Sequence, residues 1–200
     1  MAPVTVDPDK VREFATEASF YKWLAEHHDT ESEVWIRIRK VGSGLKSITP
    51  REAIDVILCW GWIDGIRKGF DETSFLQRYT PRGRKSVWSQ INVDNVARLV
   101  EAGRMTEHGL KQVEAAKQDG RWDRAYRSKD SKLPDDLQAA IDAAPRAKAM
   151  LATLSAQNRF ALIFRTENMK TEAGRKKKIA SFVEMLKRGE TIYPQGKKKA

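Results

Sequence analysis

The chain has 200 residues, which is enough for one generous domain or two small ones. Its 40% hydrophobic and 32% charged residues exclude a disordered chain and a membrane protein. The net charge of +10 is uneven, because residues 170–200 hold ten Lys or Arg against three Glu and leave +3 for the first 169 residues. The body of the chain therefore lacks the basic face expected of a DNA-binding protein.

Three features bear on the compartment. The single cysteine, Cys59, has no partner for an internal disulfide, which favours a reducing environment. The first residues, MAPVTVDPDKV, show neither the basic leader nor the apolar core of a signal peptide. No apolar run approaches the roughly 20 residues that cross a bilayer. We therefore expect a cytoplasmic protein without a membrane span.

The first half of the chain mixes helix and strand signals. The run EVWIRIRK alternates apolar and polar residues, which predicts a half-buried strand. The run TPRE at 49–52 predicts a helix start with a capping box and a proline in the first turn. In chain order the patterns predict a helix from Ser19 to His28, a strand over 33–40, a helix from Thr49 to Gly61, and two strands within 62–80 around a turn at 69–72.

Strand alternation assigns faces within WIDGIRK. Trp62, Asp64 and Ile66 are predicted on one side of the strand, with Ile63, Gly65 and Arg67 on the other. The two strands and the earlier one at 33–40 are predicted to form a meander.

The second half reads as helices only. Apolar residues at helical spacing, together with caps and glycine stops, predict helices at Asn92–Gly103, Thr106–Gly120, from Pro134, from Pro145, from Ser155, and at Thr171–Gly189. We expect an α+β fold: a small antiparallel sheet packed with helices, followed by an all-helical C-terminal region. The predicted domains are residues 1–126, 134–190 and a basic disordered tail at 191–200, with the break at 127–133.

Familiar catalytic and cofactor motifs are missing. Three histidines and one cysteine do not form a zinc pattern, since the adjacent His27 and His28 point about 100° apart on a helix. GSGLKS at 42–47 lacks the glycine and lysine order of a phosphate loop. No G-x-S-x-G elbow occurs, and Cys59 lies in an apolar stretch typical of a core residue. We expect no metal and no cofactor. The sequence identifies no catalytic motif, and Asp64 is only a candidate catalytic residue.

Residues 58–92 hold the densest chemistry of the chain. This Trp–Arg block contains three of the six tryptophans, six basic residues and three acids. Arginine forks, hydroxyls and a helix N-terminus suit a phosphate or carboxylate, and Trp88 can stack a planar group. The candidate ligand-binding residues are Trp60, Trp62, Asp64, Arg67, Arg78, Tyr79, Arg82, Ser86, Trp88, Ser89 and Asn92. The alternative is a scaffold of core tryptophans, ion-paired arginines and capping by Ser89 or Asn92.

The motifs CWGWIDG, RYTPRGRKSVWSQIN, AGRMTEHGL and DGRW resemble the YdeI/OmpD-associated proteins, also called bacteriocin-protection proteins. The C-terminal runs LSAQNRFALIFR and RKKKIASFVEMLKRGETIYPQ are similar to that family's helical region. The resemblance covers nearly the whole chain and implies a link with bacteriocin tolerance and a porin, without catalytic residues.

Three functions stay open. The first is a cytoplasmic bacterial stress- or bacteriocin-protection protein that binds a small anionic ligand or a protein against Trp62, Arg78, Arg82, Ser86 and Trp88. The second is a small hydrolase or transferase with Asp64 as general base. The third, which is not favoured, is nucleic-acid binding through the C-terminal lysines.

Overall fold

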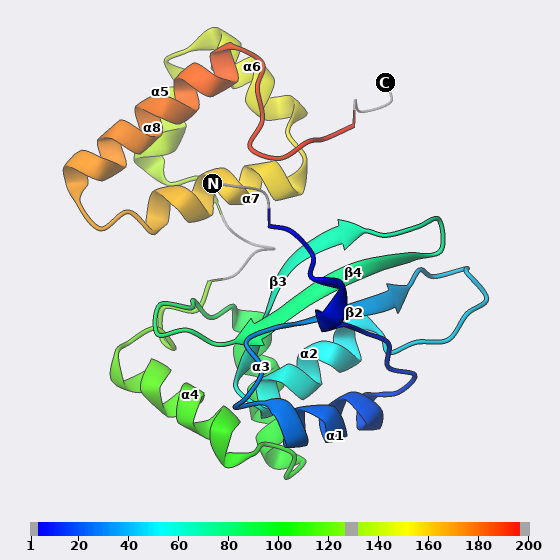
Figure 1. Cartoon of the computed structure of the whole chain (residues 1–200). Coiled ribbons are helices and arrows are strands. Elements are labelled where there is room, and N and C mark those ends of the chain that lie inside the picture. The colour runs from blue at the N-terminus through cyan, green and yellow to red at the C-terminus, as the bar shows by residue number, and fades with distance from the viewer. Residues whose placement is uncertain (1–3, 127–131, 197–200) are drawn as a thin grey trace. The chain divides into compact units, whose positions relative to one another are not determined.

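The computed structural model describes residues 4–126 and 132–196 (Figure 1). The chain divides into two compact units, residues 1–126 and 127–200. Within the described ranges, no helix combines the length and the apolar character needed to cross a membrane.

The first unit contains one four-stranded sheet. Its strands are β1 (Val11–Arg12), β2 (Val34–Arg39), β3 (Trp62–Gly69) and β4 (Ser74–Pro81). The spatial order is β1-β2-β4-β3, with β1 parallel to β2 and the other neighbours antiparallel (Figure 1). Strand β3 is therefore an edge of the sheet.

The predicted α+β class is confirmed, but the sheet is mixed rather than antiparallel. The difference comes from the two-residue strand β1, which lies before the first element that the sequence predicts. Helix α1 (Glu17–His27) connects β1 to β2. A helical crossover returns the chain in its original direction, and this makes the two strands parallel.

The predicted meander is wrong, because β2 pairs with β4 and not with the next strand along the chain. The distribution of apolar residues explains the order. Strand β4 buries Leu76 and Tyr79, whereas Asp64 to Arg67 of β3 are exposed. Exposed charges suit an edge strand, so the more apolar strand of the hairpin takes the inner place.

The helices of the first unit begin at side-chain caps. Helix α1 begins after its cap Thr16, whose hydroxyl accepts from the Ser19 N–H at 3.2 Å, so the helix starts before the predicted position at Ser19. Helix α2 (Pro50–Cys59) has the predicted capping box, in which Thr49 and Glu52 bond to each other's backbone N–H. Helices α3 (Gln90–Glu101) and α4 (Glu107–Gln118) complete the unit.

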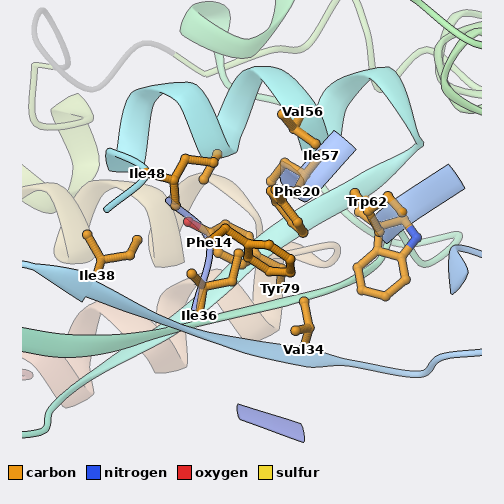
Figure 2. Close-up of a cluster of buried hydrophobic side chains, with 12 residues drawn as sticks. Phe14, Phe20, Val34, Ile36, Ile38, Ile48, Val56, Ile57, Trp62 and Tyr79 are labelled. Atoms are coloured by element: carbon orange, nitrogen blue, oxygen red, sulfur yellow. The ribbon is translucent and has the colours of Figure 1, made fainter. Parts of the chain in front are cut away.

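Helices α1 and α2 cover one face of the sheet. Figure 2 shows side chains from α2 and from strands β2 and β4 meeting around Phe20 and Tyr79, whose ring centroids lie 5.8 Å apart. A second cluster joins the end of α2 to α3 and α4 and includes Cys59 and Trp88. Here α4 approaches closely, because a Cβ on Gly109 would lie 2.3 Å from the Cys59 carbonyl oxygen.

The second unit is helical in its described part. Helices α5 (Asp135–Asp142), α6 (Pro145–Thr153), α7 (Ala156–Glu167) and α8 (Glu172–Lys187) pack around one apolar cluster (Figure 1). Residues 191–195 belong to the tail predicted at 191–200, yet Tyr193 and Gln195 hydrogen-bond to Asn158 of α7. This part of the chain therefore packs on α7, while 197–200 lie outside the described residues.

Candidate anion-binding site

A β-bulge shapes the edge strand next to the site. Asp64 pairs with Tyr79, but Arg67 pairs with Gln77, so one extra residue of β3 is accommodated between the two pairs. The Gln77 side chain donates to the Gly65 carbonyl at 2.9 Å and so satisfies the bulged backbone. Because an extra residue inverts the alternation, Arg67 lies on the same sheet face as Asp64. The prediction that they face opposite sides is wrong for this reason.

Arg82 follows β4 and is buried, with 5% of its surface exposed. Its guanidinium carbon lies 3.8 Å from the centroid of the Trp88 ring, and its Nη1 donates to the Val87 carbonyl at 3.0 Å. The Nε and Nη2 atoms are buried and have no hydrogen-bond partner among the described residues. These two nitrogens form one edge of the guanidinium, the fork that binds a carboxylate or phosphate with two parallel bonds.

Burial is the main cause that lowers the pKa of Arg82 to about 10, and the nearby charge of Arg121 acts in the same direction. The charge of Asp64 acts in the opposite direction. A guanidinium with a depressed pKa has lost hydration that its present neighbours do not replace. It remains charged at neutral pH and is therefore an electrostatic site for an anion.

Asp64 is an acid whose charge acts on the pKa of Arg82. The side chain is exposed, yet surrounding protein displaces enough water to raise its pKa, an effect that Arg82 and Arg67 oppose. Burial also raises the pKa of Tyr79, whose hydroxyl is buried without a partner, and the Asp64 charge raises it further. Asp64, Tyr79, Arg82 and Trp88 form what is called below the Arg82 cluster.

The loop that carries Arg82 and Trp88 is held by a segment that the sequence did not mark as part of the site. Arg121 donates to the Ser86 carbonyl at 2.9 Å, and Trp122 lies edge-on to Trp88 with ring centroids 4.9 Å apart. The Tyr126 N–H donates to the Trp88 carbonyl at 3.0 Å. The motif DGRW at 119–122 was the available signal, since it pairs an arginine with a tryptophan.

Several predicted site residues serve the scaffold instead. Trp62 is buried in the core and donates its indole N–H to the His28 carbonyl at 3.2 Å. Trp60 packs against Tyr21 with ring centroids 5.3 Å apart. Arg78 points to the opposite sheet face from Tyr79 and pairs with Glu33 at 2.5 Å.

The remaining predicted residues act locally. The Ser86 hydroxyl accepts from the Gly83 N–H at 3.1 Å. Ser89 caps α3 by accepting from the Asn92 N–H at 3.2 Å, as one of the open interpretations has it. The structure therefore places Arg82 against Trp88 and pairs Asp64 with Tyr79 across the strands. Tyr79 shares the core under α1 and α2 with Trp62, whereas Trp88 lies in the second apolar cluster.

Two family models match the chain, one in each unit. Residues 12–112 match a domain of unknown function, DUF8412. Residues 130–189 match the family described as bacteriocin-protection, YdeI or OmpD-associated. The DUF8412 model covers half of the chain, which therefore belongs to that family, and the C-terminal region matches the YdeI/OmpD-associated family that the sequence motifs resemble. No curated protein and no solved structure matches it.

The two matches lie in different parts of the chain. The predicted family is confirmed, but the match that names it lies in the helical region. The whole Trp–Arg block, including the Arg82 cluster, lies in the domain of unknown function. The family match therefore indicates a bacteriocin-protection type of protein. It gives no information on the Arg82 cluster, whose chemistry is argued from its geometry.

Other chemical features of the described residues give weaker indications of a functional site. Burial raises the pKa of the Cys59 thiol to about 11, so it stays protonated at neutral pH, as expected of a core residue. No group of three or more His, Cys, Asp or Glu that could hold a metal occurs in the part of the chain that the structure describes. A hollow of about 620 Å³ beside Tyr21 is lined by Glu17 and Arg104, which pair with each other.

The basic C-terminal region shows mostly local pairing where it is described. Lys176 pairs with Glu172, and Lys187 pairs with Glu184, each within α8. Arg175 pairs with Asp136 of α5. The lysines at 197–199 lie outside the described residues.

Proposed function

We propose that the first unit is a binding module that takes up an anionic group, a carboxylate or a phosphate, on the free edge of Arg82. Through this binding the chain serves a stress- or bacteriocin-protection role in the cytoplasm. The lone cysteine, a buried thiol, supports a reducing compartment. The supporting observation for the site is a buried guanidinium that uses one donor group on a carbonyl and leaves Nε and Nη2 unpaired.

The energetic reason is the cost of an uncompensated buried charge. Buried charged donors without partners destabilise a fold by about 1–3 kcal/mol or more. A carboxylate or phosphate on the Arg82 fork would supply two charge-assisted hydrogen bonds and offset that cost. Trp88 covers one face of the guanidinium and so restricts the fork to one plane. The site is therefore preorganised for a planar, two-point contact.

The proposal is tested with the Trp88 indole N–H as the reporter. Its resonance is identified with Trp88→Phe and followed by nitrogen-edited NMR while sodium acetate or sodium phosphate is added. We expect a saturable shift in the wild type. Arg82→Lys keeps the charge but removes the fork, and we expect its affinity to fall about tenfold or more.

The matched control is Arg78→Lys. Arg78 lies on the same strand but is paired with Glu33 on the other face of the sheet. Its replacement should leave the anion titration unchanged. An unchanged affinity in Arg82→Lys, or an equal loss in both variants, would refute the proposal.

General-base catalysis at Asp64 is a second candidate, favoured by one observation. Asp64 is exposed, and desolvation raises its pKa above the usual value of a carboxyl group, which makes the carboxylate a stronger base. Hydrolysis of p-nitrophenyl phosphate or acetate by wild type and Asp64→Asn tests it. A rate above background that Asp64→Asn abolishes would support catalysis, and equal rates in the two proteins would remove it.

A further inference from the structure

We propose that a hollow in the first unit, between α1 and the turn from α3 to α4, binds a small aromatic monocarboxylate. The hollow has a volume of about 620 Å³, within the range of about 300–1,000 Å³ that is usual for small-molecule sites. It shares no lining residue with the Arg82 cluster, so this inference is independent of the proposed function. The lining residues are Glu17, Ala18, Tyr21, Lys22, Gly103 and Arg104.

The walls of the hollow come from two segments that are far apart in the sequence and are held together by direct contacts. Arg104 forms an ion pair with Glu17 of α1. The Arg104 carbonyl accepts from the Tyr21 hydroxyl at 3.2 Å, and its N–H donates to the Leu99 carbonyl at 2.9 Å. A ligand that enters walls already fixed in place loses less of its binding energy to ordering the protein.

Tyr21 supplies the apolar surface of the hollow. Its ring lies edge-on to Trp60, with ring centroids 5.3 Å apart, and it packs against both core clusters of the unit. Because its hydroxyl already donates to Arg104, the ring is the surface that it offers to a ligand. Ala18 and Gly103 beside it carry a methyl group and a hydrogen atom, which leave space. A phenyl group therefore suits this wall.

The charges around the hollow select an anion. Glu17 offsets one of the two cations, Lys22 and Arg104, so the lining has a net charge of +1. Lys22 is exposed and forms no ion pair among residues 4–126 and 132–196. It lies one turn after Ala18, and helical side chains lean toward the N-terminus, which brings its ammonium group over the hollow. One unpaired cation beside an apolar wall matches one carboxylate on an apolar body.

Phenylacetate is the probe, and its ring and charge are varied separately. The reporter is the backbone N–H of Gly103 in the wall, followed by nitrogen-edited NMR of the whole chain. Phenylacetamide keeps the ring without the charge, phenethylamine reverses the charge, and acetate removes the ring. We expect a saturable shift with phenylacetate and an affinity about fivefold or more above that of each of the other three, since phenylacetate alone combines the ion pair with the ring contact.

Ala18→Leu narrows the hollow and should weaken phenylacetate binding about tenfold or more. Ala25→Leu is the matched control, because Ala25 is also exposed on α1 but does not line the hollow, and it should bind as the wild type does. Lys22→Gln should lower the affinity for phenylacetate about fivefold and leave phenylacetamide unaffected. Circular dichroism of the three variants verifies that each is folded.

The site is overturned if phenylacetate gives no saturable shift, if Ala18→Leu binds it as the wild type does, or if Ala25→Leu loses as much. The ligand class is overturned if phenylacetamide or phenethylamine binds as tightly as phenylacetate, or if Lys22→Gln keeps the full affinity. Arg82→Lys should leave the titration at Gly103 unchanged, and this separates the result from the test of the Arg82 cluster.

Discussion

The two units treat their buried polar side chains in opposite ways. In the second unit, Asn158 is 1% exposed and uses its amide fully, donating to the Tyr193 carbonyl and to Gln195 and accepting from the Tyr193 N–H. Thr166 donates to the Leu162 carbonyl at 2.8 Å. In the described part of the chain, the residues with buried and unpaired side-chain nitrogen or oxygen atoms all lie in the first unit: His28, Trp60, Tyr79, Arg82 and Trp88.

This difference separates stability from binding. A closed polar network fixes one arrangement of the chain, whereas buried donors without partners cost free energy and are rare in native proteins. Three of the five residues with unpaired atoms belong to the Arg82 cluster, and this concentration points to a ligand rather than to scattered imperfection. The buried polar groups of the second unit are therefore satisfied within the unit, and the first unit carries the proposed binding site.

The largest effect is expected where the network is closed. Asn158→Ala removes the partners of the Tyr193 backbone and leaves buried polar groups unsatisfied. We expect the free energy of unfolding of the second unit to fall by about 3 kcal/mol. Urea denaturation monitored by circular dichroism measures the loss.

Asn168→Ala is the matched control for that experiment. Asn168 also follows the pattern of an amide bonded to a backbone carbonyl on α7, at 2.8 Å from the Phe164 oxygen, but it is exposed. Its replacement should cost about 0.5 kcal/mol. Similar losses in both variants would mean that burial of the Asn158 network does not increase its contribution to the free energy of unfolding.

The next effect tests whether the first unit is simply packed loosely. Gly109→Ala places a Cβ 2.3 Å from the Cys59 carbonyl oxygen and 2.6 Å from that of Leu58. A glycine-to-alanine change normally stabilises a helix by about 1 kcal/mol, but here the close approach should destabilise the unit by about 1–3 kcal/mol. Thermal unfolding measures the sign. A gain in stability would show that α4 has room to move, and loose packing would then explain the unpaired groups.

A smaller effect, of opposite sign, is expected at Arg82. Arg82→Met replaces a buried charge that has one hydrogen-bond acceptor by an apolar chain of similar length. We expect the unliganded protein to be as stable as the wild type or more stable by about 1 kcal/mol, while anion binding is lost. Urea denaturation in a buffer without phosphate or carboxylate checks this.

Arg98→Met is the comparison for Arg82→Met. Arg98 pairs at 2.6 Å with Asp55, which is 7% exposed, so its removal leaves a buried carboxylate alone. This variant should be destabilised by at least about 1 kcal/mol. If Arg82→Met is destabilised as much as Arg98→Met, Arg82 is a structural residue and the contrast between the units disappears.

The sequence predicted the parts of the fold that local chemistry determines. The capping box of Thr49 and Glu52 and the stop at Gly61 depend on neighbours within a few residues, and both are confirmed. The partner of β2 depends on which strand of the β3–β4 hairpin takes the inner position in the sheet. Strand β1 depends on its pairing with β2, which is distant in the sequence. Single-chain patterns carry little information on such non-local pairing.

The sequence predicted where in the chain the candidate site lies, but it did not predict which residues of that stretch form it. The Trp–Arg block contains the Arg82 cluster, yet alternation alone cannot show the bulge that brings Arg67 to the Asp64 side, because the extra residue is defined only against β4. An arginine in the run PRGRK is also typical of an exposed residue. Its burial depends on Trp88 and on residues 119–126, which lie some 40 positions further along the chain.

The smallest expected effect is the pH dependence of stability at Asp64. Its pKa is raised in the folded protein, so the folded state binds the proton more tightly than the unfolded state does. Stability from this group is therefore lost as the pH rises from the unfolded pKa of about 3.8 through the folded one. Asp64→Asn, which carries no charge, should be slightly more stable than wild type at pH 7, by about 0.5 kcal/mol as for exposed positions. The difference should vanish toward pH 3.8. Melting temperatures of both proteins across this range measure it. If Asp64→Asn is less stable at pH 7, the Asp64 carboxylate already has a stabilising partner in the unliganded protein, and the expected rise of its pKa on folding is wrong.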